Sequence, residues 1–125
     1  MTEGSNGFVG LPPSWRFVGY RPGAAVLGKH GPGTLNEPDE PQYQGVVFAD
    51  GSAAMRWMTK FRSTSTWDSF EALYRVHGHP EYGTVIVWPD GMAPGVTELV
   101  ERVAQEMAQR HAAEAELTAI HPDGV

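Results

Sequence analysis

The sequence of 125 residues contains no cysteine, which excludes disulfides, thiolate nucleophiles and cysteine-ligated metal sites. It has no apolar run near the roughly 18 residues that a membrane-spanning helix needs. Its first six residues also lack the basic and apolar regions of a signal peptide. We therefore expect a cytoplasmic protein that does not bind membranes, located in the host cytoplasm if a phage encodes it.

Positive charge is scarce as well. The chain has 9 Lys and Arg against 15 Asp and Glu, which gives a formal net charge of −6. This balance argues against general nucleic-acid binding, although it leaves room for a local basic patch. The sequence has no Gly-x-Ser-x-Gly turn, Walker loop or His-Glu-x-x-His motif. It thus leans against an enzyme and gives no sign of a cofactor, although a Ser–His–Asp triad is recognised only by its geometry.

Glycine and proline are concentrated near the N-terminus, where residues 1–41 hold 6 Pro and 8 Gly. This composition is typical of turns and extended chain, so we expect an irregular arm over residues 1–43. Within it, residues 15–20 alternate in character and form a further candidate strand. The acidic, proline-broken residues 36–41 are typical of a solvated linker. A single α+β domain is expected over 44–117, with a frayed tail over 118–125.

A β-hairpin is expected over residues 44–58, because Asp50-Gly51 is a favoured dipeptide of a two-residue turn. Such a turn fixes the register, with residue 48 opposite 53 and residue 45 opposite 56. One face of the hairpin should then be the core face, and the other should carry Val47, Ala54 and Arg56. The residues expected on the core face are Val46, Phe48, Ala53, Met55 and Trp57.

Two helices and another strand complete the expected fold. Apolar residues at helical spacing predict a helix over 67–77, capped by the hydroxyls of residues 63–66. Gly78 is expected to end it in the left-handed conformation. The continuous apolar run 84–88 predicts a strand inside the sheet, and residues 96–117 predict a long helix. The result is a small, mainly antiparallel sheet with helices 67–77 and 96–117 packed on one face.

Several short segments between residues 45 and 90 occur together in one known group of proteins. They are Gly45-Val46-Val47-Phe48-Ala49-Asp50-Gly51, Arg56-Trp57, Arg62-Ser63-Thr64, Trp67-Asp68-Ser69 and His77-Gly78-His79. As a set they resemble small proteins of unknown activity from actinobacteria and their phages. The resemblance implies an accessory gene product carried by a phage, and it assigns no catalytic residue.

One basic stretch stands out, because residues 51–67 hold three cations and no acidic residue. It leads into hydroxyl side chains at an expected helix N-terminus, where backbone N–H groups favour an anion. Arginine forks and hydroxyls together suit a phosphate or carboxylate. The residues of this candidate ligand site are Arg56, Lys60, Arg62, Ser63, Thr64, Ser65 and Thr66. The favoured alternative is structural, in which the hydroxyls cap the helix and the arginines pair with nearby carboxylates.

His77 and His79 are the candidate metal ligands, with a carboxylate from elsewhere in the chain. The favoured interpretation is that this segment simply ends the helix, so we predict no metal site. Four tryptophans could stack on a base, but they are expected to supply core area in so small a domain.

The sequence favours a non-enzymatic accessory protein that binds another protein or self-assembles as a homo-oligomer. The proline- and glycine-rich arm supports this, since such arms wrap partners. The alternative is a small module that binds, and thereby sequesters, an anionic small molecule or nucleotide through the basic stretch. A metal-dependent hydrolase built on His77 and His79 is a third reading.

Overall fold

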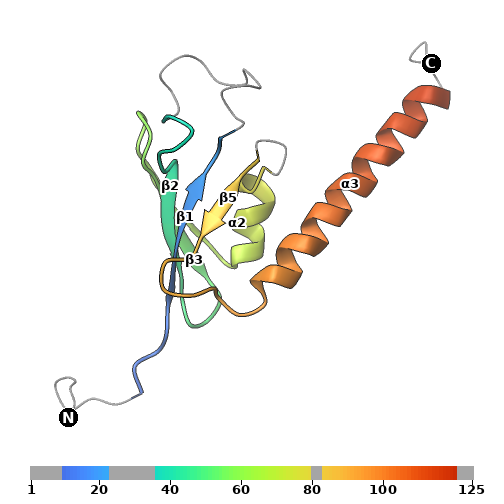
Figure 1. The fold of residues 1–125 in the computed structure, drawn as a ribbon. Coiled ribbons are helices and arrows are strands. Elements are labelled where there is room, and N and C mark those ends of the chain that lie inside the picture. The colour runs from blue at the N-terminus through green and yellow to red at the C-terminus, as the bar shows by residue number, and fades with distance from the viewer. Residues whose placement is uncertain (1–9, 23–35, 80–82, 121–125) are drawn as a thin grey trace. The chain divides into compact units, whose positions relative to one another are not determined.

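The computed structural model describes residues 10–22, 36–79 and 83–120. In chain order the elements are β1 (Trp15–Tyr20), β2 (Tyr43–Val47), β3 (Ala53–Trp57), β4 (Thr64–Trp67), α2 (Phe70–His77), β5 (Val85–Val87) and α3 (Val96–Ile120). The strands form one antiparallel sheet in the order β4-β3-β2-β1-β5 (Figure 1). The chain divides into two compact units, residues 1–93 and 94–125. The expected small α+β fold with an antiparallel sheet is confirmed.

Strand β1 lies inside the segment for which the sequence suggested an irregular arm. It pairs with β2 on one side and β5 on the other, so it is an inner strand of the sheet. Its alternation is the expected one, with Phe17 and Gly19 buried and Arg16 exposed. The period-two pattern of these six residues outweighs the high glycine and proline content around them.

The β2–β3 hairpin has a different register from the one expected. Val47 pairs with Ala53, and Phe48 N donates to Ser52 O at 2.8 Å, so the loop has three residues instead of two. Gly51 takes a φ of +90°, and its N–H donates to Phe48 O at 2.9 Å. This is a type I turn followed by a left-handed glycine, the usual geometry of a three-residue hairpin loop.

The one-residue shift reverses the faces of β2 but not those of β3. The expectation that Ala53 and Met55 face the core is confirmed, as both are 1% exposed. The expectation that Val46 and Phe48 do so is wrong, because Tyr43 and Val47 take the buried positions.

Two glycines on the core face make room for aromatic rings of the neighbouring strand. Phe17 pairs with Gly45 and Tyr43 pairs with Gly19 across β1 and β2. A Cβ atom on Gly45 would lie 2.3 Å from the Phe17 ring, and one on Gly19 would lie 2.2 Å from the Tyr43 ring. Each ring therefore occupies the space directly above a glycine, which brings both rings close to the sheet.

Helix α2 covers this core face. Phe70 of α2 contacts the rings of Phe17 and Trp88 at centroid distances of 5.4 and 5.3 Å. At the other end of the helix, His77 lies edge-on to Trp57 and Trp67 at 5.3 and 5.4 Å. The tryptophans on the core-facing positions 57 and 67 thus supply core contacts, as expected.

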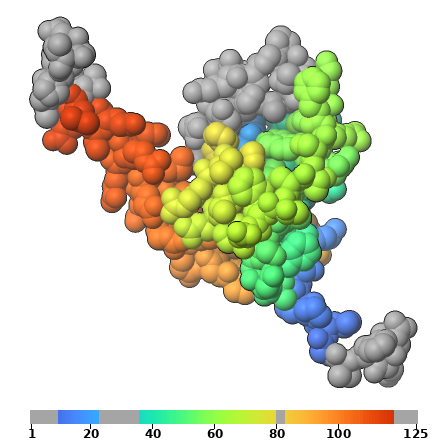
Figure 2. Space-filling model, turned by 180° about the vertical axis from the view of Figure 1, so that it is seen from behind, coloured from blue at the N-terminus to red at the C-terminus, as the bar shows by residue number. Residues whose placement is uncertain are grey.

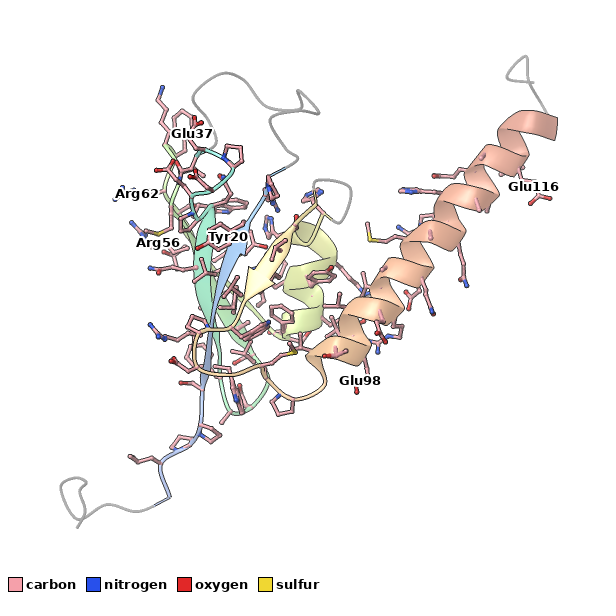
Figure 3. All side chains as sticks on the ribbon, in the orientation of Figure 1. Tyr20, Glu37, Arg56, Arg62, Glu98 and Glu116 are labelled. Atoms are coloured by element: carbon pink, nitrogen blue, oxygen red, sulfur yellow. The ribbon has the colours of Figure 1, made fainter. Side chains whose placement is uncertain are left out.

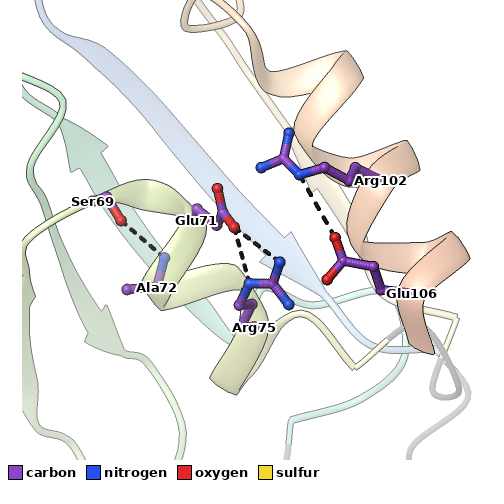
Figure 4. Close-up of polar contacts among 6 residues, drawn as sticks. All are labelled: Ser69, Glu71, Ala72, Arg75, Arg102 and Glu106. Atoms are coloured by element: carbon purple, nitrogen blue, oxygen red, sulfur yellow. Dashed lines mark hydrogen bonds and ion pairs between the residues drawn. The ribbon is translucent and has the colours of Figure 1, made fainter. Parts of the chain in front are cut away.

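The start of α2 differs from the expectation. Residues 64–67 form strand β4, so the hydroxyls of residues 63–66 cap no helix. The N-cap is Ser69, whose Oγ accepts from Ala72 N at 3.1 Å (Figure 4). Glu71 and Arg75 form an ion pair one turn apart on the same helix. Threonines suit a strand as well as a cap, and here pairing with β3 decides between the two.

The end of α2 also differs from the expectation. Gly78 has right-handed helical angles, φ −68° and ψ −40°, and the positive φ of 37° falls on His79. Glycine is needed at position 78 for space, because a Cβ there would lie 2.4 Å from Tyr74 O. The run over residues 84–88 gives β5, which is an edge strand and not the inner strand expected, with Val85 and Val87 exposed.

The unit of residues 94–125 contains α3, whose observed start agrees with the predicted helix. Its buried and half-buried side chains lie between Val96 and Met107, and every residue from Ala108 to Leu117 is exposed. None of the described helices is long and apolar enough to cross a membrane.

Candidate functional site: the outer face of the sheet

One face of the sheet carries α2, and the opposite face is called the outer face below. Strand alternation and register place on it Arg16, Val18, Tyr20, Gln44, Val46, Phe48, Ala54, Arg56, Thr64, Thr66, Val85 and Val87. Large apolar side chains lie open on this face, since Phe48 is 43%, Val85 51% and Val87 44% exposed. Residues that the sequence pattern places in a core are thus in contact with solvent.

An open hollow of about 450 Å³ lies in the middle of the outer face. Small and apolar residues, Val18, Val46 and Ala54, line it together with Gln44 and the two arginines described next. Its lack of enclosure distinguishes it from the deep clefts that bury most of a small molecule.

Arginines stand on two sides of the hollow. Arg16 Nε donates to Asp90 Oδ2 at 2.7 Å, and this contact lowers the pKa of the Asp90 carboxyl. Arg56 Nη1 donates to Thr64 Oγ1 at 2.8 Å on the neighbouring strand. The guanidinium of Arg16 is therefore neutralised locally, whereas among the described residues that of Arg56 has a hydroxyl as its one partner.

Arg56, Lys60 and Arg62 form no ion pair with any described residue, so the carboxylate pairing of the structural alternative is not seen. Arg56 and Arg62 project from the same side of the molecule (Figure 3). Lys60 Nζ lies 5.5 Å from the Phe61 ring centroid in the β3–β4 loop, which projects from its surroundings in Figure 2.

The hydroxyl residues of the candidate ligand site are divided between the two sides of β4. Thr64 and Thr66 lie on the outer face, but Ser65 lies on the core side, where its Oγ accepts from Trp67 Nε1 at 2.9 Å. Ser63 O accepts the backbone N–H of Trp57 at 2.9 Å. The structure therefore brings Arg56 and Thr64 together, but no described helix begins beside them.

The acidic segment before β2 is more organised than a solvated linker. Gln42 is fully buried and bonds Asn36 in both directions, with Asn36 N donating to Oε1 and Nε2 donating to Asn36 O, each at 3.0 Å. Asn36 Nδ2 also donates to Met58 O at 3.1 Å. The carboxylates of this segment thus lie at the same end of the sheet as the basic β3–β4 loop. None of them forms an ion pair with Lys60 or Arg62 of that loop.

In the part of the chain that the structure describes, no three metal-binding side chains lie together, and His77 and His79 have other contacts. His77 packs between tryptophan rings, and His79 O accepts from Thr84 Oγ1 at 2.8 Å.

A buried arginine, Arg21, which no sequence pattern indicated, lies next to His77. Arg21 lies 5.1 Å from the Trp57 ring centroid and donates to His77 O. Burial raises the pKa of nearby Tyr43 to about 12, although the Arg21 charge opposes the rise.

Acid should destabilise the protein through His77. Burial, together with the charges of Arg21 and His79, lowers the pKa of His77 from 6.5, so the unfolded chain binds the proton more readily than the folded chain. Stability from this group is present above pH 6.5 and is lost as the pH falls toward the lowered value. The melting temperature of the wild type should therefore fall more between pH 7.5 and 5.5 than that of His77→Gln. Equal slopes for the two proteins would contradict this prediction.

The fold defines a small α+β protein with α2 on one face of its sheet and no other described helix or strand of residues 1–93 on the opposite face. Residues 43–90 match the family described as Acb5 phage protein. This match, which covers less than half of the chain, confirms the phage resemblance predicted for residues 45–90, whereas an origin in actinobacteria stays a prediction. No curated protein and no solved structure matches the chain.

Proposed function

We propose that this is a phage-encoded accessory protein that binds another protein through the outer face of its sheet. The observation that carries the proposal is the exposure of Phe48, Val85 and Val87 on a sheet face that no described element of residues 1–93 covers. Burying such side chains against a partner stabilises a complex by about 25 cal/mol per Å² of apolar surface, before the costs of association.

The partner expected for this surface has an apolar centre flanked by carboxylates. Arg56 lies on the outer face and Lys60 and Arg62 lie in the adjoining β3–β4 loop, all without ion pairs to described residues, in a chain of net charge −6. Opposite charge on the partner would steer the encounter and fix its orientation. The alternative of a small anionic ligand has weaker support, because the helix N-terminus on which it relied is a strand.

Photocrosslinking in the host cell tests this proposal. A photoreactive residue is placed at Phe48 or Val87 on the outer face, and at Val76 of α2 as a control of similar exposure, 50%. We expect both outer-face positions to give an adduct with the same protein, identified by mass spectrometry, and the Val76 position to give none. Absence of an adduct at the outer face, equal adducts at Val76, or an adduct of two copies of this chain would overturn the proposal.

A further inference from the structure

Strand β4 has a free edge. Among the described strands it pairs only with β3, and it ends the sheet. Trp57 N donates to Ser63 O at 2.9 Å, so residues 57 and 63 are a hydrogen-bonded pair. In an antiparallel ladder every second pair is bonded, so Ser65 and Trp67 also direct their backbone groups toward β3. The backbone N–H and C=O groups of Thr64 and Thr66 therefore point away from β3, and no described group bonds to them.

The edge carries few of the features that prevent strand addition. Edge strands are usually protected by a lysine, a proline, a bulge or a covering element. The residues of β4 are Thr, Ser, Thr and Trp, with neither charge nor proline among them. Its shortness limits the ladder that can form, so a partner segment would need side-chain contacts in addition to backbone bonds.

The side chains at the start of this edge are basic, and Asp68 is the first acidic residue after it. Arg56 lies beside Thr64 on the outer face, and Lys60 and Arg62 precede β4 in the loop. Residues 51–67 contain no acidic residue. A segment lying along β4 would thus meet three positive charges, each without an ion-pair partner among the described residues.

We infer that β4 receives an extended acidic segment of the partner protein as a sixth strand of the sheet. The segment's backbone bonds to the outward groups of Thr64 and Thr66. Its side chains alternate, with carboxylates on the outer face toward Arg56 and apolar groups on the side of Trp67. This inference rests on the proposed function, because a strand added at β4 widens the outer face on which the partner docks.

The probe is an acetylated and amidated heptapeptide in which valine and glutamate alternate, added to the full 15N-labelled protein at low ionic strength. We expect saturable binding with a Kd at or below about 1 mM and slower hydrogen exchange at the amides of Thr64 and Thr66, with little change at Ser65. A peptide with lysine in place of glutamate should bind at least about tenfold more weakly. Absence of binding, or equal binding of the two peptides, would overturn the inference.

Thr66→Pro separates strand addition from simple charge attraction. The substitution removes a backbone N–H that points away from β3 and takes no part in the β3–β4 ladder. Proline is tolerated at such edge positions. We expect at least about tenfold weaker peptide binding, whereas Thr66→Val, which keeps the N–H, should bind like the wild type. If Thr66→Pro fails to fold, a peptide N-methylated at alternate amides provides the same test on the wild type. Wild-type affinity in either case would contradict strand addition.

The two proposals can fail separately. If the peptide does not bind but crosslinks at Phe48 and Val87 find one partner, the outer face is the interface and the added strand is wrong. If the peptide binds while those crosslinks find no partner, the β4 edge is a peptide site and the docking face is wrong.

Discussion

Replacing Phe17 by Ala is expected to lower the free energy of unfolding by about 3–5 kcal/mol, the range for a buried phenylalanine truncated to alanine. Phe17 is fully buried on an inner strand. Its ring contacts Tyr43, Phe70 and Trp88, so one side chain joins β1, β2, α2 and the residue after β5. Gly45 beneath the ring has no side chain that could fill the cavity that truncation leaves.

Chemical denaturation of the full chain measures this effect, and the neighbour on the same strand provides the control. Val18 faces the opposite side of the sheet and is half-buried, so Val18→Ala should cost about 1 kcal/mol or less. Similar losses for Phe17→Ala and Val18→Ala would mean that the two faces of the sheet do not differ in packing as described.

Gly45→Ala is expected to lower the free energy of unfolding by about 2–3 kcal/mol through overpacking. The added methyl would lie 2.3 Å from Phe17 Cζ and 2.4 Å from Ala54 O, and the second of these is backbone and cannot rotate away. Since a backbone atom is involved, the strands themselves must shift to accept the methyl group.

A double-mutant cycle identifies the cause of that loss. Phe17→Leu removes the ring from above position 45, so the combined variant should lose less stability than the two single losses added together. Denaturant midpoints of the four proteins give the coupling. Strict additivity would contradict the predicted coupling and would assign the loss to the clash with Ala54 O instead of the Phe17 ring.

The hairpin shows what the sequence could and could not predict about the fold. Asp50-Gly51 correctly marked the turn, and the alternation of β3 correctly placed Met55 inside and Arg56 outside. A left-handed glycine serves two-residue and three-residue loops alike, so the dipeptide did not determine the loop length. One residue of difference in the loop moved Phe48 from the expected core to the surface.

The arrangement of the candidate site residues also depended on strand pairing that the sequence does not specify. The basic residues were recognisable from their spacing in an acidic chain, but the position of Thr64 beside Arg56 follows from the β3–β4 pairing, which a hydroxyl-rich segment does not specify on its own. The apolar outer face was hidden for a similar reason, because Val85 and Val87 have the composition of an inner strand and lie at an edge. Arg21 had no sequence signal, since its burial depends on rings from β2 and β3.

The affinity of the crosslinked partner for outer-face variants tests the proposed interface most directly. With the partner purified, calorimetric titration compares the wild type with Val87→Glu on the outer face and Val76→Glu on α2, two valines of similar exposure, 44% and 50%. A buried, unpaired carboxylate at the interface should weaken binding by at least about tenfold for Val87→Glu, while Val76→Glu should bind like the wild type. Unchanged affinity for Val87→Glu, or an equal loss for Val76→Glu, would show that the partner does not dock on the outer face of the sheet.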